Sequence, residues 1–417
     1  METNFDVVVC GGGPGGIGAA LGAARAGANV LLIERYGFLG GGGTAMLVNP
    51  FMWFTSGERQ LVHGVFQEII DRLTELGAYR RRAFDPEALK IAAEELCLEA
   101  GVKLLYHSFL ADCQVSDNKI QSIRVATKDG LKTITAKTYV DSTGDGDLAF
   151  FAGAPTKKGR DEDGLSQPMT MNFRMANVDK TKKPPVQEMT KLYVAAKADG
   201  KIKCPREDIL VFTTLQDDVV HFNQTRVVMH DAVDPESLTA AEIESRRQVW
   251  QISQWLIKEV PGFENAYLQR TAAQVGVRES RRVIGDYVLT GEELLAASRF
   301  DDVIACGSYD IDIHNPLGEG TVIKRLKPGE FYDIPYRAIV PRKIDNLLVG
   351  GRSISTTHEA HSSIRIIPIV CAIGQAAGVA AAKCANQNIC TRDLDVSKLQ
   401  QELLRQGATL GDFVPLV

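Results

Sequence analysis

A glycine-rich turn near the start of the chain limits the folds that this sequence can adopt. Strand-forming residues from Asp6 to Cys10 give way to six glycines between Gly11 and Gly18, and Pro14–Ala26 then has the pattern of a helix of small residues. Glycine lacks a Cβ, so the chain can turn tightly there and another molecule can approach the backbone closely. Strand, glycine turn and helix in this order are typical of a dinucleotide-binding βαβ unit.

Two glycine registers overlap in this turn, and the end of the preceding strand favours the one formed by Gly11, Gly13 and Gly16. A second strand over Ala28–Ile33 leads to Glu34, about 20 residues on, where an acid accepts the ribose hydroxyls of a dinucleotide. The helix N-terminus offers free N–H groups to the phosphates. The alternative is a tight strand–helix turn that binds no ligand. The predicted nucleotide contacts here are Gly11, Gly13, Pro14, Gly15, Gly16, Glu34 and Arg35.

Charge and composition narrow the class of protein. The net charge of −5 and a pI near 5.9 argue against nucleic acid as a partner, and the basic triplet Arg80–Arg82 is best explained as a solvated turn. The N-terminus lacks a basic region, which argues against a signal peptide, and the apolar run Ile366–Ala382 is expected to be a buried helix and not a membrane span. Eight cysteines without a CxxC pair indicate reduced thiols, so we expect a cytoplasmic protein.

The hydrophobic pattern predicts two domains, built from three consecutive stretches of the chain. Residues 1–156 form the N-terminal part of a nucleotide-binding domain, residues 157–330 form an inserted substrate domain, and residues 331–417 complete the first domain. In the first stretch, we expect helices over Val62–Leu76 and from Asp85 to Ala100, then an antiparallel meander of four strands. These strands are predicted at Val102–Ser108, Phe109–Val115, Lys119–Ala126 and Leu131–Tyr139.

The inserted stretch is expected to mix strands with a long helix, and the chain then returns to the first domain near Asp333. Its predicted strands are Met169–Met175, Ile209–Thr214 and Val219–Val227, and its helix is Thr239–Glu259. In the last stretch, a buried strand is predicted at Asn346–Val349, followed by helices over Ser362–Asn386 and Ser397–Gln406. This is an α/β architecture with an inserted mixed α+β domain.

Six motifs in series resemble one family. They are Gly11–Gly16, Leu39–Thr44, Asp141–Asp147, Arg278–Arg282, His314–Pro316 and Gly350–Ser353. Together they resemble the FAD-dependent oxidoreductases with a Rossmann-like FAD-binding domain of the glutathione-reductase type, distant relatives of the fumarate reductase and succinate dehydrogenase flavoproteins. The resemblance implies FAD and not NAD as the cofactor. No second GxGxxG follows a later strand, so electrons are expected to pass between FAD and a substrate, a protein carrier or oxygen.

The resemblance also implies where the flavin lies. The glycine loop would lie flat against the ring and Thr44 would bond its edge, unless the loop is simply flexible surface. The strand end at Asp141 would approach the cofactor, with Asp145 on a ribityl hydroxyl. A calcium loop is rejected because Thr143 and Ala152 stand where an EF-hand needs an acid or amide and a glutamate, and no metal is predicted. Ser362–Ile364 would begin a helix whose N-terminus faces the flavin pyrimidine. The further cofactor residues are therefore Gly42, Gly43, Thr44, Ala111, Thr143, Gly144, Asp145, Gly351, Arg352, Ser363 and Ile364.

Histidines and arginines are the candidates for chemistry beside the flavin. The spacing of His361 and Arg365 is similar to the substrate-clamping segment of fumarate reductases, but Ile366-Ile-Pro replaces its glycine-rich continuation, so a dicarboxylate substrate is doubtful. His314 follows alternating polar and apolar residues and is either an acid/base group or a strand-end histidine bonded to a backbone carbonyl. His358 and His361 supply only two ligands, which argues against zinc. The predicted catalytic residues are His314, Arg365, His361, Arg278 and Arg281.

The sequence thus predicts a cytoplasmic FAD-dependent oxidoreductase that transfers hydride between a C–H or C–C bond of a small or medium organic substrate and flavin N5. Two alternatives stay open: a nicotinamide-binding dehydrogenase without flavin, and a non-catalytic flavin-binding scaffold for a redox partner. The partner is expected to be a small molecule, with neither nucleic acid nor membrane, and the oligomeric state is left open.

Overall fold

This computed structural model describes residues 3–413, which form a larger and a smaller body, each with its own hydrophobic core. A parallel sheet forms the centre of the larger body. Its strands run in the order β7-β2-β1-β10-β21, and each neighbouring pair is parallel. Their bounds are β1 Asn4–Cys10, β2 Val30–Ile33, β7 Lys103–Leu105, β10 Gly130–Asp141 and β21 Leu347–Val349. All four residues of β2 and all three of β21 are buried, as expected for strands covered on both faces.

The long strand β10 belongs to two pairings at once. Its C-terminal half lies parallel to β1, and its first residues pair antiparallel with β9 (Lys119–Thr127), which in turn pairs with β8 (Phe109–Ser116). The predicted meander therefore forms with three strands. The segment predicted as its first strand, Val102–Ser108, instead contributes β7 to the parallel sheet, because the preceding helix carries the chain back across the sheet to lie beside β2.

Two helices pack against each other through glycine. A Cβ added to Gly374 or Gly378 of α9 (Ile367–Gln387) would collide with a backbone carbonyl oxygen of α1 (Pro14–Arg25). The two helix backbones are therefore in direct contact, which leaves no room for side chains between them. By length and hydropathy α9 is a candidate membrane span, but 83% of its most apolar window is buried inside the protein.

The helix predicted over Ser362–Asn386 is two helices in the structure. A short helix α8 (His358–Ile364) ends before Arg365, Ile366 has an extended backbone, and α9 begins at Ile367 with Pro368 in its first turn. Proline is tolerated in the first turn of a helix, but in a helix interior its ring clashes with the carbonyl four residues earlier. The prediction was wrong because it ran the helix through Pro368.

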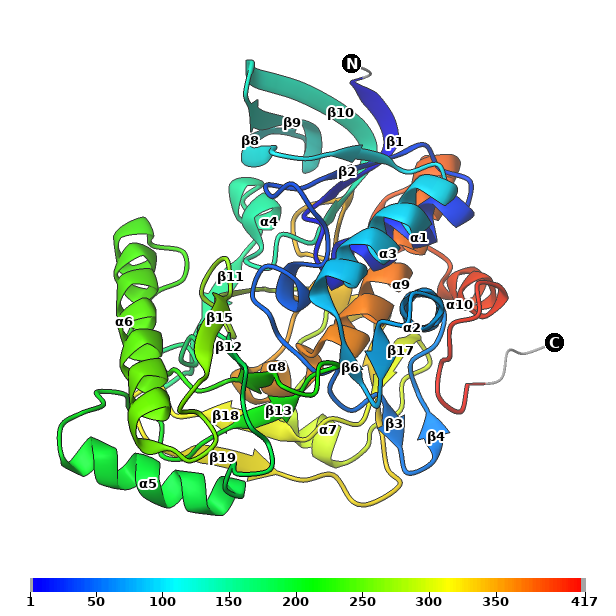
Figure 1. The fold of residues 1–417 in the computed structure, drawn as a ribbon. Helices are drawn as coiled ribbons and strands as arrows, with labels where there is room; N and C mark the ends of the chain where they lie inside the picture. Colours follow the sequence, from blue (N-terminus) through cyan, green and yellow to red (C-terminus); the bar gives the residue numbers. More distant parts are fainter. Residues whose placement is uncertain (1–2, 414–417) are drawn as a thin grey trace.

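The remaining helices of the larger body pack against its other helices or lie beside its outer strands (Figure 1). Asp85 caps α3 by accepting a hydrogen bond from the backbone N–H of Glu87, as its position before a helix predicts. The bounds are α2 Val65–Glu75, α3 Pro86–Glu99, α4 Asp147–Phe151, α7 Gly291–Leu295 and α10 Val396–Arg405. The short strands are β3 Thr55–Ser56, β4 Arg59–Gln60, β5 Tyr79–Arg80, β6 Ala83–Phe84, β17 Val303–Gly307 and β20 Tyr332–Pro335, and the short 3-10 helices are η1 Gly41–Gly43, η2 Tyr336–Ile339 and η3 Thr391–Asp393.

A smaller body has its own sheet and its own core. Its four antiparallel strands run in the order β13-β14-β12-β15, and two long helices pack on them at the edge of the molecule, green in Figure 1. The bounds are β12 Phe173–Ala176, β13 Val211–Thr213, β14 Val220–Phe222, β15 Tyr267–Thr271, α5 Val186–Ala198 and α6 Pro235–Glu259. Phe173 stacks on Phe222 at the centre of this core, with ring centroids 4.8 Å apart.

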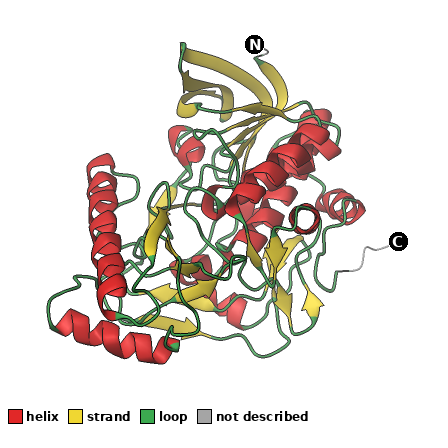
Figure 2. Cartoon of the chain, viewed as in Figure 1, coloured by secondary structure: helices red, strands yellow, loops and turns green. Residues whose placement is uncertain are grey.

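A two-stranded antiparallel pair, one hairpin and many loops connect the bodies. The pair joins β11 (Thr156–Lys158) to β16 (Arg281–Val283), far apart in the chain, and the hairpin joins β18 (Ile311–His314) to β19 (Thr321–Lys324). Loops dominate the middle of the molecule in Figure 2. The domain boundaries stay a prediction, but buried residues from Val283 to Cys306, expected in the inserted domain, pack in the core of the larger body.

Candidate active site

A groove forms where the glycine turn meets the loops that follow β2, β10 and β21. We call it the glycine groove; it encloses about 120 Å³. The predicted residues that line it are Gly11, Gly13, Pro14, Gly15, Glu34, Arg35, Gly42, Thr143, Gly144, Gly351 and Arg352. Gly41 and Ser142 also line it and lie inside the predicted motifs Leu39–Thr44 and Asp141–Asp147, although they were not singled out. Sequence reasoning missed Tyr36, Ala45, Met46, Gln274, Ile367 and Val370. A smaller pocket of about 50 Å³ shares Gly11, Glu34, Arg35 and Thr143 with it and also contacts Phe109.

The glycines of the turn have different roles. A Cβ on Gly16 would collide with the carbonyl oxygen of Gly11, and a Cβ on Gly15 would collide with that of Gly350. A Cβ on Gly13 would meet nothing closer than the Cα of Gly41 at 3.9 Å, so this residue faces the open groove. Gly13 also precedes Pro14, the first residue of α1, whose first-turn N–H groups lie beside the same space. The fold itself requires Gly15 and Gly16, whereas Gly13 is free of such contacts.

Glu34 is buried at 7% exposure and ties two backbone segments to the groove. Its Oε2 accepts a hydrogen bond from the N–H of Gly12 at 2.7 Å, and its Oε1 accepts one from the N–H of Tyr36 at 2.9 Å. Each carboxylate oxygen has more than one acceptor site, so both keep capacity for a ligand hydroxyl. The neighbouring Arg35 donates to Gln274 of the smaller body and so bridges the groove.

Within the loop Leu39–Thr44, some residues line the groove and others are buried in the protein interior. Gly42 lines the groove and a Cβ there would meet nothing within 4 Å, whereas a Cβ on Gly43 would press on the Leu89 side chain. Thr44 is buried, and its hydroxyl donates to the carbonyl of Leu39 at 2.8 Å. The hydroxyl predicted to bond the flavin edge is therefore used within its own loop.

Four other predicted cofactor residues lie outside the groove lining. Asp145 accepts hydrogen bonds from Arg352 at 2.8 Å and Ser280 at 2.6 Å, and it lines a separate pocket between the bodies. Ser363 and Ile364 are buried within α8, because the helix expected to begin there begins at Ile367. Ala111 lies on β8, next to Leu110 of the smaller pocket.

A second cavity of about 210 Å³ borders the groove, and we call it the arginine cavity. It shares Gly42, Met46, Arg352, Arg365 and Ile367 with the groove, so the two spaces adjoin. Both bodies line it. The remaining lining residues are Val48, Asn49, Pro50, Met52, Thr170, Asn172, Leu210, Phe212, Asn223, Gly276, Val277, Arg278, Tyr309, Asp312, His314 and Ile366.

Three of the five predicted catalytic residues meet in this cavity: His314, Arg278 and Arg365. His361 does not line it; it is fully buried in α8, with Nε2 at 3.1 Å from the backbone oxygen of Arg278. Arg281 points elsewhere, forming an ion pair with Asp147 at 2.7 Å. Among residues 3–413, no group of three or more His, Cys, Asp or Glu side chains is arranged to hold a metal ion.

Comparison with a family model identifies the class of protein to which the glycine groove and the arginine cavity belong. The model described as FAD dependent oxidoreductase matches residues 6–403, nearly the whole chain. The chain belongs to the FAD-dependent oxidoreductase family. It is therefore an enzyme, and its cofactor is FAD.

Several curated proteins match short segments of this chain. The chain is 44% identical over 63 residues to the soluble pyridine nucleotide transhydrogenase of Photobacterium profundum, and 58% identical over 41 residues to that of Hamiltonella defensa. These segments cover 15% and 10% of this chain, and 12% and 9% of those proteins. The matches therefore leave most of both chains without a counterpart.

Solved structures resemble this FAD-dependent oxidoreductase over more of its length but weakly. A geranylgeranyl bacteriochlorophyll reductase-like protein from Thermoplasma acidophilum aligns with a TM-score of 0.47 and 13% identity, covering 97% of this chain and 84% of that one. The L-proline dehydrogenase of P. horikoshii aligns at 0.46 and 11%, covering 98% and 100%. At this level the likeness does not specify the fold.

The residues present fit FAD. The glycine groove offers the N-terminus of α1 to phosphates, and open space beside Gly13 and Gly42 allows a ligand to approach the backbone. Glu34 lines both the groove and the smaller pocket, where a ribose would lie. Phe109, which is half-exposed at the smaller pocket, was missed because an exposed aromatic residue on a strand carries no distinctive pattern.

Three arginines line the arginine cavity; Arg352 pairs with Asp145, whereas Arg278 and Arg365 have other partners. Arg278 donates to the carbonyl of Pro168 at 2.7 Å and to Thr170 at 2.6 Å, and Arg365 donates to Gln167 at 3.2 Å. Neither guanidinium has a carboxylate oxygen within 4.0 Å among residues 3–413. Burial lowers the pKa of both, and each also feels other arginines, but a guanidinium stays charged in proteins.

Asp312 and His314 face each other on the same side of β18. His314 Nε2 lies 3.6 Å from Asp312 Oδ2. Burial, and then the charge of Arg278, lower the pKa of His314 to about 3, so the ring is neutral. Burial alone would raise the pKa of Asp312, but His314 and the two arginines hold it below its usual range. Asp312 was missed, although its position two residues before His314 in a strand places it on the same face.

Proposed function

We propose that this enzyme transfers hydride between a carbon of a small organic carboxylate and flavin N5. The observation that carries the proposal is the pair Arg278 and Arg365, two guanidinium groups in one cavity without an ion-pair partner among residues 3–413. A buried cation left unpaired is costly, so a cavity that holds two is suited to an anion that arrives with the substrate. The adjoining glycine groove supports a flavin close to this cavity.

FAD would be held mainly by backbone groups. In this proposal the nucleotide lies as in glutathione-reductase-type domains, with its phosphates at α1, a ribose on Glu34 and its other half between Gly42 and Gly351. When bound, FAD supplies the acceptor or donor of the hydride. The distant relationship to fumarate reductase flavoproteins is part of the same proposal.

The chain's own residues would orient the substrate. Arg278 and Arg365 bind its carboxylate, and the apolar walls formed by Met52, Leu210 and Phe212 exclude water from the rest of the molecule. His314 and Asp312 lie beside the arginines and meet the polar groups of the reacting carbon. Because the cavity mixes charged and apolar walls, we propose a monocarboxylate with an apolar body over a dicarboxylate.

The test is an anaerobic reduction of the purified yellow protein. A panel of monocarboxylates and dicarboxylates is mixed with the enzyme, and the flavin band is followed. Arg278→Met should keep its flavin and slow substrate-driven reduction at least about a hundredfold, because one charge-assisted clamp is lost. Arg124→Met is the control, since Arg124 is an exposed arginine paired with Asp112 on the meander. Equal rates for both variants, or reduction by neutral analogues alone, would contradict the proposal.

The cellular setting also stays a proposal. We propose a cytoplasmic enzyme that passes electrons to oxygen or to a protein carrier, since the sequence has a single dinucleotide-binding glycine motif. Anaerobic mixing with NADPH tests the electron acceptor. If the enzyme had a dedicated nicotinamide site, NADPH would reduce the flavin rapidly at micromolar concentration.

A further inference from the structure

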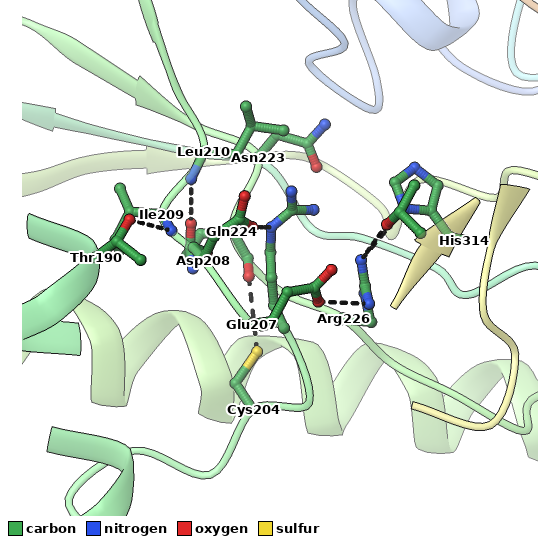
Figure 3. A network of polar contacts seen from close by, with 12 residues as sticks. Thr190, Cys204, Glu207, Asp208, Ile209, Leu210, Asn223, Gln224, Arg226 and His314 are labelled. Atoms are coloured by element: carbon green, nitrogen blue, oxygen red, sulfur yellow. Dashed lines mark hydrogen bonds and ion pairs between the residues drawn. The ribbon is translucent and has the colours of Figure 1, made fainter. Parts of the chain in front are cut away.

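Arg226 lies behind the arginine cavity and contacts one of its catalytic candidates. It follows β14 in the smaller body and is 1% exposed. Its Nη1 pairs with Glu207 Oε2 at 2.8 Å and donates to the carbonyl of Gly318 at 2.9 Å. Its Nη2 lies 3.2 Å from His314 Nδ1. Figure 3 shows Arg226 between Glu207 and His314.

This contact determines which nitrogen of His314 carries the proton. A guanidinium has only donors, so an Nη2–H directed at Nδ1 requires a lone pair there. Thr321 Oγ1, also 3.2 Å from Nδ1, accepts from the same Nη2 at 3.3 Å and has its own proton free to donate. A neutral imidazole with an unprotonated Nδ1 must be protonated at Nε2. That nitrogen lies on the side of Asp312, which lines the arginine cavity with His314.

We propose that Arg226 is a positioning residue that holds His314 as its Nε2–H tautomer, so that His314 donates a hydrogen bond to the substrate and does not act as a general base. Protonation of Nδ1 would set an N–H against the guanidinium and bury a second cation beside it. The substrate oxygen that accepts this bond belongs to the proposed function, on which this part of the inference rests.

The charges around His314 favour the same state. Arg226 and Glu207 lie behind the ring as an ion pair, Asp312 lies beside it, and Arg278 and Arg365 lie across the same cavity. With three arginines near it, the ring gains little from Asp312 on taking up a proton, in agreement with the direction of its pKa. A fixed neutral donor stabilises negative charge that develops on a substrate oxygen, without any reorganisation at the moment of reaction.

The first test reads the tautomer directly. The flavin-loaded protein is labelled with ¹⁵N-histidine, and His314 is identified by the signal that His314→Gln removes. We expect a protonated Nε2 and an unprotonated Nδ1 from about pH 8 down to about pH 5, a range in which an ordinary histidine gains its charge. A ring protonated at Nδ1, or one that becomes doubly protonated across this range, would overturn the inference.

Substitutions of Arg226 then test its role. Arg226→Met should allow His314 to titrate with a higher pKa, and Arg226→Lys, which keeps a donor, should preserve the wild-type tautomer. Because Arg226→Met leaves the partly exposed Glu207 without its ion-pair partner, the double variant Arg226→Met/Glu207→Gln is prepared alongside it. An unchanged histidine signal in the folded double variant would contradict the positioning role.

The last comparison uses the reach of two amides. The amide nitrogen of glutamine lies near the position of histidine Nε2, and that of asparagine lies near Nδ1. His314→Gln should therefore keep kcat/KM within about tenfold of wild type, whereas His314→Asn should lose about a hundredfold. Equal losses would contradict donation from Nε2. A wild-type protein with protonated Nε2 that no carboxylate reduces would refute the proposed substrate and leave the tautomer assignment intact.

Discussion

The glycine groove and the arginine cavity are neighbours built in opposite ways. The groove is rich in exposed backbone: seven of its 20 lining residues are glycines, among them Gly11, Gly13, Gly42 and Gly351. The cavity is mostly side chains, and they come from loops and strands of both bodies. A site made of backbone requires glycine at fixed spacing and so leaves a motif in the sequence, whereas a site made of side chains requires only that distant segments meet.

The largest expected effect separates two kinds of glycine. Gly13→Val should fold and lose its flavin, because a Cβ there would enter the groove with no neighbour closer than the Cα of Gly41 at 3.9 Å. Gly378→Val should fail to give soluble protein, because its Cβ would collide with the carbonyl of Ala19 on α1. Flavin absorbance and far-ultraviolet circular dichroism distinguish the two outcomes. A Gly13→Val protein that keeps its flavin would show that the groove does not hold the cofactor.

A second prediction concerns the ionic support of the cavity. Glu279, which follows Arg278 in the chain, is fully buried, pairs with Arg282 and has a carboxylate oxygen 2.9 Å from Nδ1 of His358. Burial alone would raise its pKa, but His358, His361 and Arg282 lower it to about 2. Because the folded pKa lies below the unfolded one, the stabilisation is complete above about pH 4.5 and is lost as the pH falls towards 2.

Glu279→Gln should therefore cost about 3 kcal/mol at neutral pH, with a smaller difference from wild type in acid. Urea unfolding of both proteins at several pH values measures this difference. A difference in unfolding free energy that does not change with pH would mean that the ionised carboxylate of Glu279 is not the source of this stabilisation. Glu58→Gln serves as the control, because it removes a carboxylate at an exposed position.

The smallest expected effect tests how far the groove depends on backbone. Thr44→Val removes one buried hydroxyl bonded to Leu39, so stability should fall by about 1 kcal/mol. The flavin spectrum and occupancy should not change, because the hydroxyl points into its own loop. A shifted spectrum would restore the contact with the flavin edge that the sequence suggested and would weaken the contrast between the two sites.

Local patterns predicted the elements well where one short segment carried the whole signal. The elements that lie where the sequence placed them are the first βαβ unit, the Asp85 cap, and the helices α2 and α3 before the meander. The errors arose where a pattern was carried past a local stop. The helix drawn through Pro368 misplaced Ser363 and Ile364, and the strand at Val102–Ser108 was assigned to the wrong sheet.

Side-chain direction limited the prediction of the site more than residue choice did. His361 and Arg365 were chosen together from their spacing, yet the end of α8 lies between them. Arg365 therefore lines the cavity, whereas His361 is buried against the backbone of Arg278. Asp312 had a visible signal in the alternation of its strand. Arg226 had none, because it lies 88 residues from His314 in the chain.

The sequence by itself determined the backbone-built part of this protein: the glycine turn, the strand and helix around it, and the acid that ends the second strand. These features depend on φ, on missing Cβ atoms and on residues within a few turns of one another, all of which are local. The tertiary structure alone decided which arginines face one cavity and which nitrogen of His314 meets Arg226. Both depend on segments from two bodies meeting, and burial and hydrogen bonding act only once those segments are in contact.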